Sequence, residues 1–149
     1  MGQPRVVDSM EAAVDGLLGA IAGPIVLGLP LGIGKPNRFV NALYRRIRAL
    51  PGRRLVVVTA LSLERPQGRS DLERHFLEPL AERLFGDYPD LDYVGDARGA
   101  GLPPNVEVRE FFFRSGAYLG NEAAQRSFVA SNYTFVARDM VLQLSLIHI

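Results

Sequence analysis

Residues 55–61 read Leu55-Val-Val-Val-Thr-Ala-Leu61, an uncharged run rich in β-branched side chains. Such a run predicts a strand that is buried on both faces, as the strands of a parallel sheet are. Thr59 lies toward the carboxyl end of this strand, where open α/β sheets bind ligands. A β-branched residue placed in a strand for its shape explains Thr59 equally well.

Strands and helices alternate on both sides of this run. Residues 25–29 and 106–113 predict two more buried strands, the second ending in Phe111-Phe112-Phe113. Helices are expected over residues 10–21, 38–50, from 70 onward and over 122–129; 91–98 is a short helix or a connection, and 133–143 an element of open type. This order predicts an open, mostly parallel α/β sheet with flanking helices.

Four residues have the side chains that cap helix N-termini: Ser9, Asn37, Ser70 and Asn121. The helix after Ser70 is expected to bury an apolar face made of Leu72, Phe76, Leu77, Leu80 and Leu84. Pro79 lies within that helix and predicts a kink or a restart. His75, among charged neighbours, is expected at the surface.

Composition excludes several classes of function. The chain has 149 residues, enough for one domain, and a net charge of +1, which is not the basic surface that nucleic-acid binding needs. It has no cysteine, which excludes disulfides, thiolate zinc sites and cysteine nucleophiles. No other spacing suggests metal ligands. The absence of cysteine fits a reducing compartment, and we expect a cytoplasmic protein.

Residues 16–34 are uncharged and long enough to suggest a membrane span. Six glycines and two prolines, Pro24 and Pro30, interrupt this stretch. We expect three pieces instead, a helix end, a buried strand and a glycine-rich turn, and no membrane partner. A membrane anchor here remains the outside alternative.

The glycine-rich turn is the main candidate site, because glycines between a strand and a helix let a ligand approach the backbone. It does not match the mononucleotide loop, since five residues separate Gly28 from Gly34-Lys35 and Pro36 follows. Asn37 occupies the position of the third glycine of the dinucleotide fingerprint. A phosphate or acyl-ligand loop of another type and a simple tight turn both stay open. Lys35 is either an anion partner or a solvated lysine.

Several strings together resemble the acetyl-CoA hydrolase/transferase family. The first is Gly28-Leu-Pro-Leu-Gly-Ile-Gly-Lys-Pro-Asn-Arg-Phe-Val-Asn-Ala-Leu43. The others are residues 58–66, 76–86, 102–113, 118–125 and 131–134. The resemblance runs from about residue 10 to residue 143, through most of the family's first α/β domain.

The resemblance implies two similar open α/β domains and an enzyme that moves coenzyme A between carboxylic acids or releases it to water. A glutamate of the second domain attacks the thioester in that family. No residue here matches that glutamate, so no catalytic residue is carried over. Substrate or CoA contacts are implied for Gly28, Gly32, Gly34, Lys35, Pro36 and Asn37, and more weakly for Ser131 and Asn132.

The same resemblance implies that residues 1–143 form an incomplete amino-terminal domain. Residues 144–149 are apolar and look like a translated sequencing-adapter read-through, so we expect them not to belong to the natural protein. Its partners are acyl-CoA and carboxylate substrates and its own second domain, with coenzyme A as substrate rather than a bound cofactor. A homo-oligomer of the full-length protein is compatible with it. The alternative is a non-catalytic α/β module that binds a nucleotide or another anion. The sequence does not decide whether the enzyme is a hydrolase or a transferase, or which acyl group it carries.

Overall fold

A three-stranded parallel sheet forms the centre of the protein. The computed structural model describes residues 6–30, 32–112, 115–116 and 118–144. Strands β1 (Ile25–Gly28), β2 (Leu55–Thr59) and β3 (Val106–Glu110) lie in the order β1-β2-β3. Both pairs are parallel, with Leu55 of β2 beside Ile25 and Val106. The open parallel α/β sheet is thereby confirmed, and every residue of the central β2 is buried.

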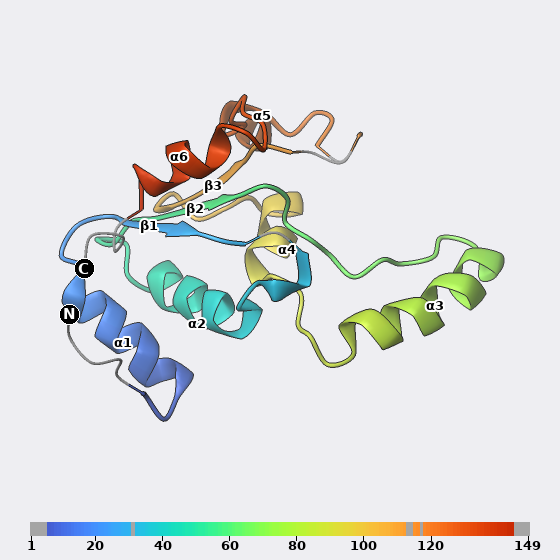
Figure 1. Cartoon of the computed structure of the whole chain (residues 1–149), viewed down its shortest axis with the longest axis horizontal. Helices are drawn as coiled ribbons and strands as arrows, with labels where there is room; N and C mark the ends of the chain where they lie inside the picture. Colours follow the sequence, from blue (N-terminus) through green and yellow to red (C-terminus); the bar gives the residue numbers. More distant parts are fainter. Residues whose placement is uncertain (1–5, 31, 113–114, 117, 145–149) are drawn as a thin grey trace.

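Helices cover both faces of this sheet (Figure 1). One face carries α1 (Met10–Ala20), α2 (Asn37–Arg48) and α4 (Asp92–Arg98). The other carries α5 (Glu122–Arg126) and α6 (Val136–Val141). The short 3₁₀ helix η1 (Gly32–Gly34) follows β1. Helix α3 (Asp71–Phe85) projects away from the sheet, at the end of two long connections (Figure 1).

The core lies between the sheet and α2. Leu55 and Val57 of β2 pack with the buried stripe of α2, which comprises Val40, Leu43, Tyr44 and Ile47. The Tyr44 hydroxyl donates to the Asp96 carboxylate at 2.5 Å, and so joins α2 to α4. A smaller cluster of Ala60, Phe111 and Val136 lies on the other face.

Local signals placed most elements correctly. The side chains of Ser9, Ser70 and Asn121 each accept a backbone N–H of the first turn that follows them, as predicted. Residues 16–34 divide into the end of α1, strand β1 and η1, as expected. Among the residues that the structure describes, no helix has both the length and the apolar character needed to cross a membrane.

Strand β3 is shorter than predicted. It ends at Glu110, and Phe111 is buried beyond it, but Phe112 is 49% exposed. The prediction of a strand whose second half is fully covered is therefore wrong. Phe113 lies outside the described residues.

The predicted burial of the α3 apolar face is also wrong. Leu72 is 82% exposed, Phe76 74%, Leu84 50% and Leu80 42%. The helix uses its other side, with Ala81 and Phe85, to contact the rest of the protein. Pro79 lies inside one continuous helix, so it causes no restart. His75 is exposed, as expected.

Candidate functional site

The carboxyl ends of the three strands meet at one edge of the sheet, where parallel α/β sheets place ligands. Six polar residues are buried there, on or just after these strand ends and on the neighbouring helices. We call them the carboxyl-edge cluster: Lys35, Asn37, Thr59, Ser62, Tyr93 and Glu110. Since buried polar groups cost free energy unless they are paired, the partner of each one matters.

Glu110 is the acid of this cluster. One of its carboxylate oxygens accepts the backbone N–H of Ser62 at 2.5 Å. The Ser62 hydroxyl in turn shares a hydrogen bond of 2.7 Å with the Tyr93 hydroxyl. Tyr93, Ser62 and Glu110 therefore form a hydrogen-bonded chain from α4 to the end of β3.

Burial is the main influence on the pKa of the Glu110 carboxyl. Removal from water raises the pKa of its carboxyl above the ordinary value, against the lowering effect of the Ser62 hydrogen bonds and of Lys35. Burial likewise raises the pKa of the Tyr93 hydroxyl. Both groups are thus biased toward their protonated, neutral forms.

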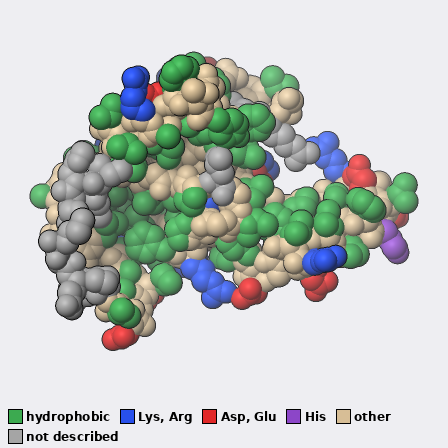
Figure 2. Space-filling model, in the orientation of Figure 1, with side chains coloured by type: hydrophobic (Ala, Val, Ile, Leu, Met, Phe, Trp, Pro, Cys, Tyr) green, Lys and Arg blue, Asp and Glu red, His purple; other side chains and the backbone are tan. Residues whose placement is uncertain are grey.

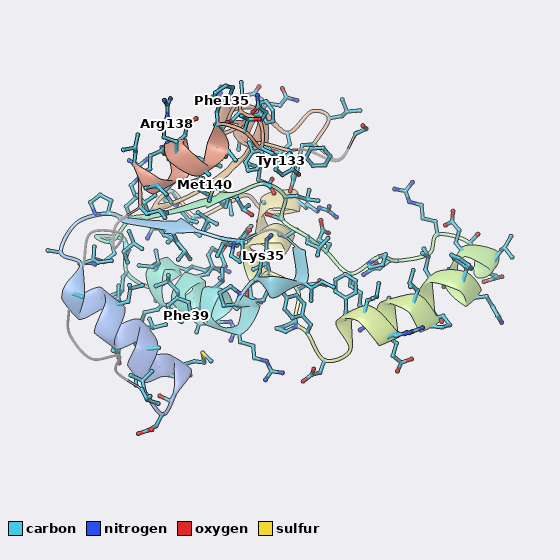
Figure 3. All side chains as sticks on the ribbon, in the orientation of Figure 1. Lys35, Phe39, Tyr133, Phe135, Arg138 and Met140 are labelled. Atoms are coloured by element: carbon cyan, nitrogen blue, oxygen red, sulfur yellow. The ribbon has the colours of Figure 1, made fainter. Side chains whose placement is uncertain are left out.

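Lys35 is the single lysine of the chain and is only 3% exposed. Its ammonium donates to the Pro30 carbonyl at 2.6 Å, and its own carbonyl accepts the Tyr88 hydroxyl at 2.8 Å. Burial lowers the pKa of the amine, and the negative charge of Glu110 opposes that effect. The alternative of a solvated lysine is therefore wrong. Lys35 lies in the loop between β1 and α2 (Figure 3), and its bond to Pro30 links two points of that loop.

Asn37 is not the N-cap of α2 but its first residue, and Pro36 takes the cap position. The prediction of a cap is wrong: the Asn37 side chain makes no capping hydrogen bond, and its amide nitrogen donates to the Pro89 carbonyl at 2.8 Å. Its Oδ1 is buried without a hydrogen-bond partner among the described residues. Thr59 Oγ1 is also buried without a hydrogen-bond partner among the described residues. Thr59 lies beside Glu110 in the register of β2 and β3. Two buried oxygens at this edge therefore have no hydrogen-bond partner among the described residues.

The three glycines of the turn differ in their surroundings. Gly32 has φ +67°, a backbone conformation that favours glycine. At Gly34 a Cβ would meet nothing within 4 Å, so its surface is open to a ligand. At Gly28 a Cβ would lie 2.8 Å from the Leu144 side chain and 3.2 Å from that of Met140. Gly28 therefore makes room for α6 and the residues after it.

Ser131 and Asn132 lie just before α6. The Asn132 Oδ1 accepts the backbone N–H groups of Thr134 at 2.9 Å and Phe135 at 3.3 Å, which is a local turn. Ser131 Oγ is buried without a partner in the described part of the chain. No hydrogen bond found among the described residues joins this pair to the glycine turn, so the structure brings together Lys35, Asn37 and the strand ends only.

A hollow of about 1840 Å³ opens beside the cluster. Its lining includes Glu110, Tyr93, Arg98 and Tyr118. The Arg98 guanidinium forms an ion pair with Glu64. Phe76 of α3 also lines this hollow. Within the carboxyl-edge cluster, Glu110 and Tyr93 thus border a large open space.

Three members of the cluster escaped sequence reasoning: Ser62, Tyr93 and Glu110. Glu110 offered one signal, an acid between a strand and three phenylalanines, which is an expensive place for a charge. Tyr93 and Ser62 had none, because their bond joins residues 31 positions apart.

Comparison with family models, curated proteins and solved structures finds no match. Among the residues that the structure describes, no group of three His, Cys, Asp or Glu side chains is arranged to hold a metal ion.

Proposed function

We propose that this chain is the amino-terminal α/β domain of an enzyme that transfers coenzyme A between carboxylic acids or releases it to water. The carboxyl-edge cluster and the glycine turn bind the acyl end of the thioester. The observation that carries this proposal is the pair of buried, unpartnered oxygens of Asn37 and Thr59, beside a buried lysine. The resemblance of the glycine turn to acetyl-CoA hydrolase/transferase proteins suggests acyl-CoA as the class of ligand.

The chemistry of an acyl-CoA suits these groups. Its pantetheine arm carries amide N–H groups, from which the Asn37 Oδ1 can accept. Its thioester carbonyl is an acceptor, to which the Thr59 hydroxyl can donate. The open surface at Gly34 lets the ligand reach the backbone of the turn.

We assign no nucleophile within this chain. The Glu110 carboxylate is occupied by the Ser62 N–H, and burial favours its neutral form, which is a poor nucleophile. The resemblance places the attacking glutamate in a second domain. The chain is therefore expected to bind acyl-CoA without turning it over.

One observation favours the alternative, a module that binds a nucleotide or another anion without catalysis. Helix α2 begins without a side-chain cap, next to Lys35. Uncapped N–H groups at a helix N-terminus attract anions. The state of Lys35 opposes this alternative, because burial lowers the pKa of its amine and the amine already donates to the Pro30 carbonyl.

Calorimetric titration of the chain with four ligands separates the two proposals: acetyl-CoA, coenzyme A, ADP and acetate. Tighter binding of acetyl-CoA than of ADP supports the acyl-CoA site. Equal affinity for ADP and acetyl-CoA favours the anion-binding module, because the acyl-pantetheine part then contributes nothing to the binding free energy. Binding of none of the four overturns both.

A further inference from the structure

We infer that the exposed apolar face of α3 is a docking surface for a second copy of this chain, whose own α3 lies antiparallel on it. We call Leu72, Phe76, Leu80 and Leu84 the α3 face. All four are between 42% and 82% exposed. Figure 2 shows hydrophobic side chains gathered along this helix. This inference does not depend on the proposed function.

The α3 face has the pattern of a helix that packs against a partner. Its members recur every fourth residue, which builds one continuous ridge along the helix. Ala81 and Phe85, on the other side, already attach α3 to its own chain. A helix with apolar residues on two sides needs two neighbours, and a contiguous exposed apolar surface of this kind marks an interaction site.

The order of residues along α3 is compatible with a second copy as the partner. Counted outward from Glu78, Leu72 mirrors Leu84 and Phe76 mirrors Leu80. In a two-fold interface each residue meets the mirror position of the other copy. Antiparallel pairing about Glu78 therefore brings apolar residues against apolar residues.

Two charged residues beside the α3 face are also related by this symmetry, and they carry opposite charges. Glu73 mirrors Arg83, so the acid of each copy lies level with the arginine of the other. Among the described residues, Arg83 has no ion-pair partner. Glu73 uses one carboxylate oxygen to accept the Arg69 N–H at 2.7 Å, which leaves the other oxygen for a second donor. The acid in the first turn of α3 and the arginine in its last turn, which suit the dipole of the helix, therefore face each other when two copies pair antiparallel.

Only the first half of the α3 face borders the hollow: Leu72 and Phe76 line it, whereas Leu80 and Leu84 are exposed but do not. Ridges of the i, i+4 kind pack against each other at a crossing angle near −50°, which is the commonest arrangement in globular proteins.

The first experiment is sedimentation equilibrium of the chain over micromolar concentrations, with one disruptive variant and one matched control. Phe76→Glu places a charge in the centre of the α3 face and is expected to give a monomer. His75→Glu introduces the same side chain at the exposed neighbouring position, away from the face, and is expected to leave the dimer intact. A monomeric parent chain, or equal association of the two variants, overturns the inference.

A charge-reversal experiment tests the antiparallel register itself. Arg83→Glu alone and Glu73→Arg alone each bring like charges together at both ends of the interface, so each is expected to associate at least about tenfold more weakly than the parent. In a mixed dimer of the two variants, one copy carries arginine at both positions and the other carries glutamate at both. Every facing pair then has opposite charges, so the mixture is expected to regain dimers.

Circular dichroism of each charge-reversal variant checks that α3 still forms. A mixture that associates no better than its separate components contradicts the antiparallel register.

Discussion

Thr59 and Glu110 are register partners at the last paired positions of β2 and β3, side by side at the carboxyl edge of the sheet. Both are buried, but the Thr59 hydroxyl has no partner in the described structure, whereas the Glu110 carboxylate is held by Ser62. The rest of β2 is apolar. The polarity of β2 is thus confined to the edge where we propose that the ligand binds.

Burial of Glu110 predicts a specific pH dependence. Because its folded-state pKa is raised above the ordinary 4.5, the folded chain holds this proton more tightly than the unfolded chain. Its contribution to stability is fully present below pH 4.5 and is lost as the pH rises through the folded pKa. The free energy of unfolding of the parent, relative to Glu110→Gln, should therefore fall by about 1.4 kcal/mol for each pH unit between the two pKa values.

Glu107, on the same strand, is a control of opposite sign. Hydrogen bonds from Arg109 and Arg54 lower the pKa of its carboxyl, so its stabilising contribution is present above the unfolded pKa and is lost as the pH falls through the folded one. Urea unfolding of the parent, Glu110→Gln and Glu107→Gln measures both slopes when the series runs from well below pH 4, where Glu107 titrates, to pH 8. Equal slopes for the two variants would show that Glu110 is not buried as described.

Truncation of leucines should reproduce the division between core and surface. Leu43→Ala removes a fully buried side chain from α2 and is expected to cost about 2–5 kcal/mol of unfolding free energy. Leu119→Ala, at a largely exposed position, is expected to change it by less than about 0.5 kcal/mol. Chemical denaturation of both variants at one dilute concentration gives the comparison. A cost at Leu43 as small as at Leu119 contradicts the packing of α2 on the sheet.

The single lysine allows a chemical test of its burial. An amine-selective acylating reagent should modify Lys35 much more slowly in the folded chain than in urea, because the amine is buried and donates to the Pro30 carbonyl. Mass spectrometry of the peptide that contains Lys35 measures both rates. Similar rates in the two conditions would show that the loop between β1 and α2 is open.

The sequence was sufficient to predict the fold class and most element positions, for local reasons. Runs such as Leu55–Thr59 are long and uncharged, and caps such as Ser70 act within one helical turn. Helix α3 shows the limit of this reasoning. Its periodicity correctly predicts an apolar face, but periodicity does not say what covers that face, and in this chain nothing described does.

The candidate site was predictable only in its chain-local part. The glycine turn and the carboxyl end of β2 follow from strand and helix order, so the sequence alone identifies Lys35, Asn37 and Thr59 as candidates. The partners of these residues come from elsewhere: Asn37 bonds to Pro89, 52 positions away, and Glu110 to Ser62, 48 positions away. Such pairings depend on the packing of α4 and β3, which no local pattern specifies.

The most direct test of the proposed acyl-CoA site compares two glycine substitutions. Gly34→Val fills the open surface of the glycine turn, whereas Gly52→Val adds the same side chain between α2 and β2, at the opposite edge of the sheet; a Cβ meets nothing within 4 Å at either position. Both variants should therefore fold. Calorimetric titration with acetyl-CoA should show binding by the parent and by Gly52→Val, and at least about tenfold weaker binding by Gly34→Val. Unchanged affinity in Gly34→Val, or no binding by the parent, would contradict the proposed site.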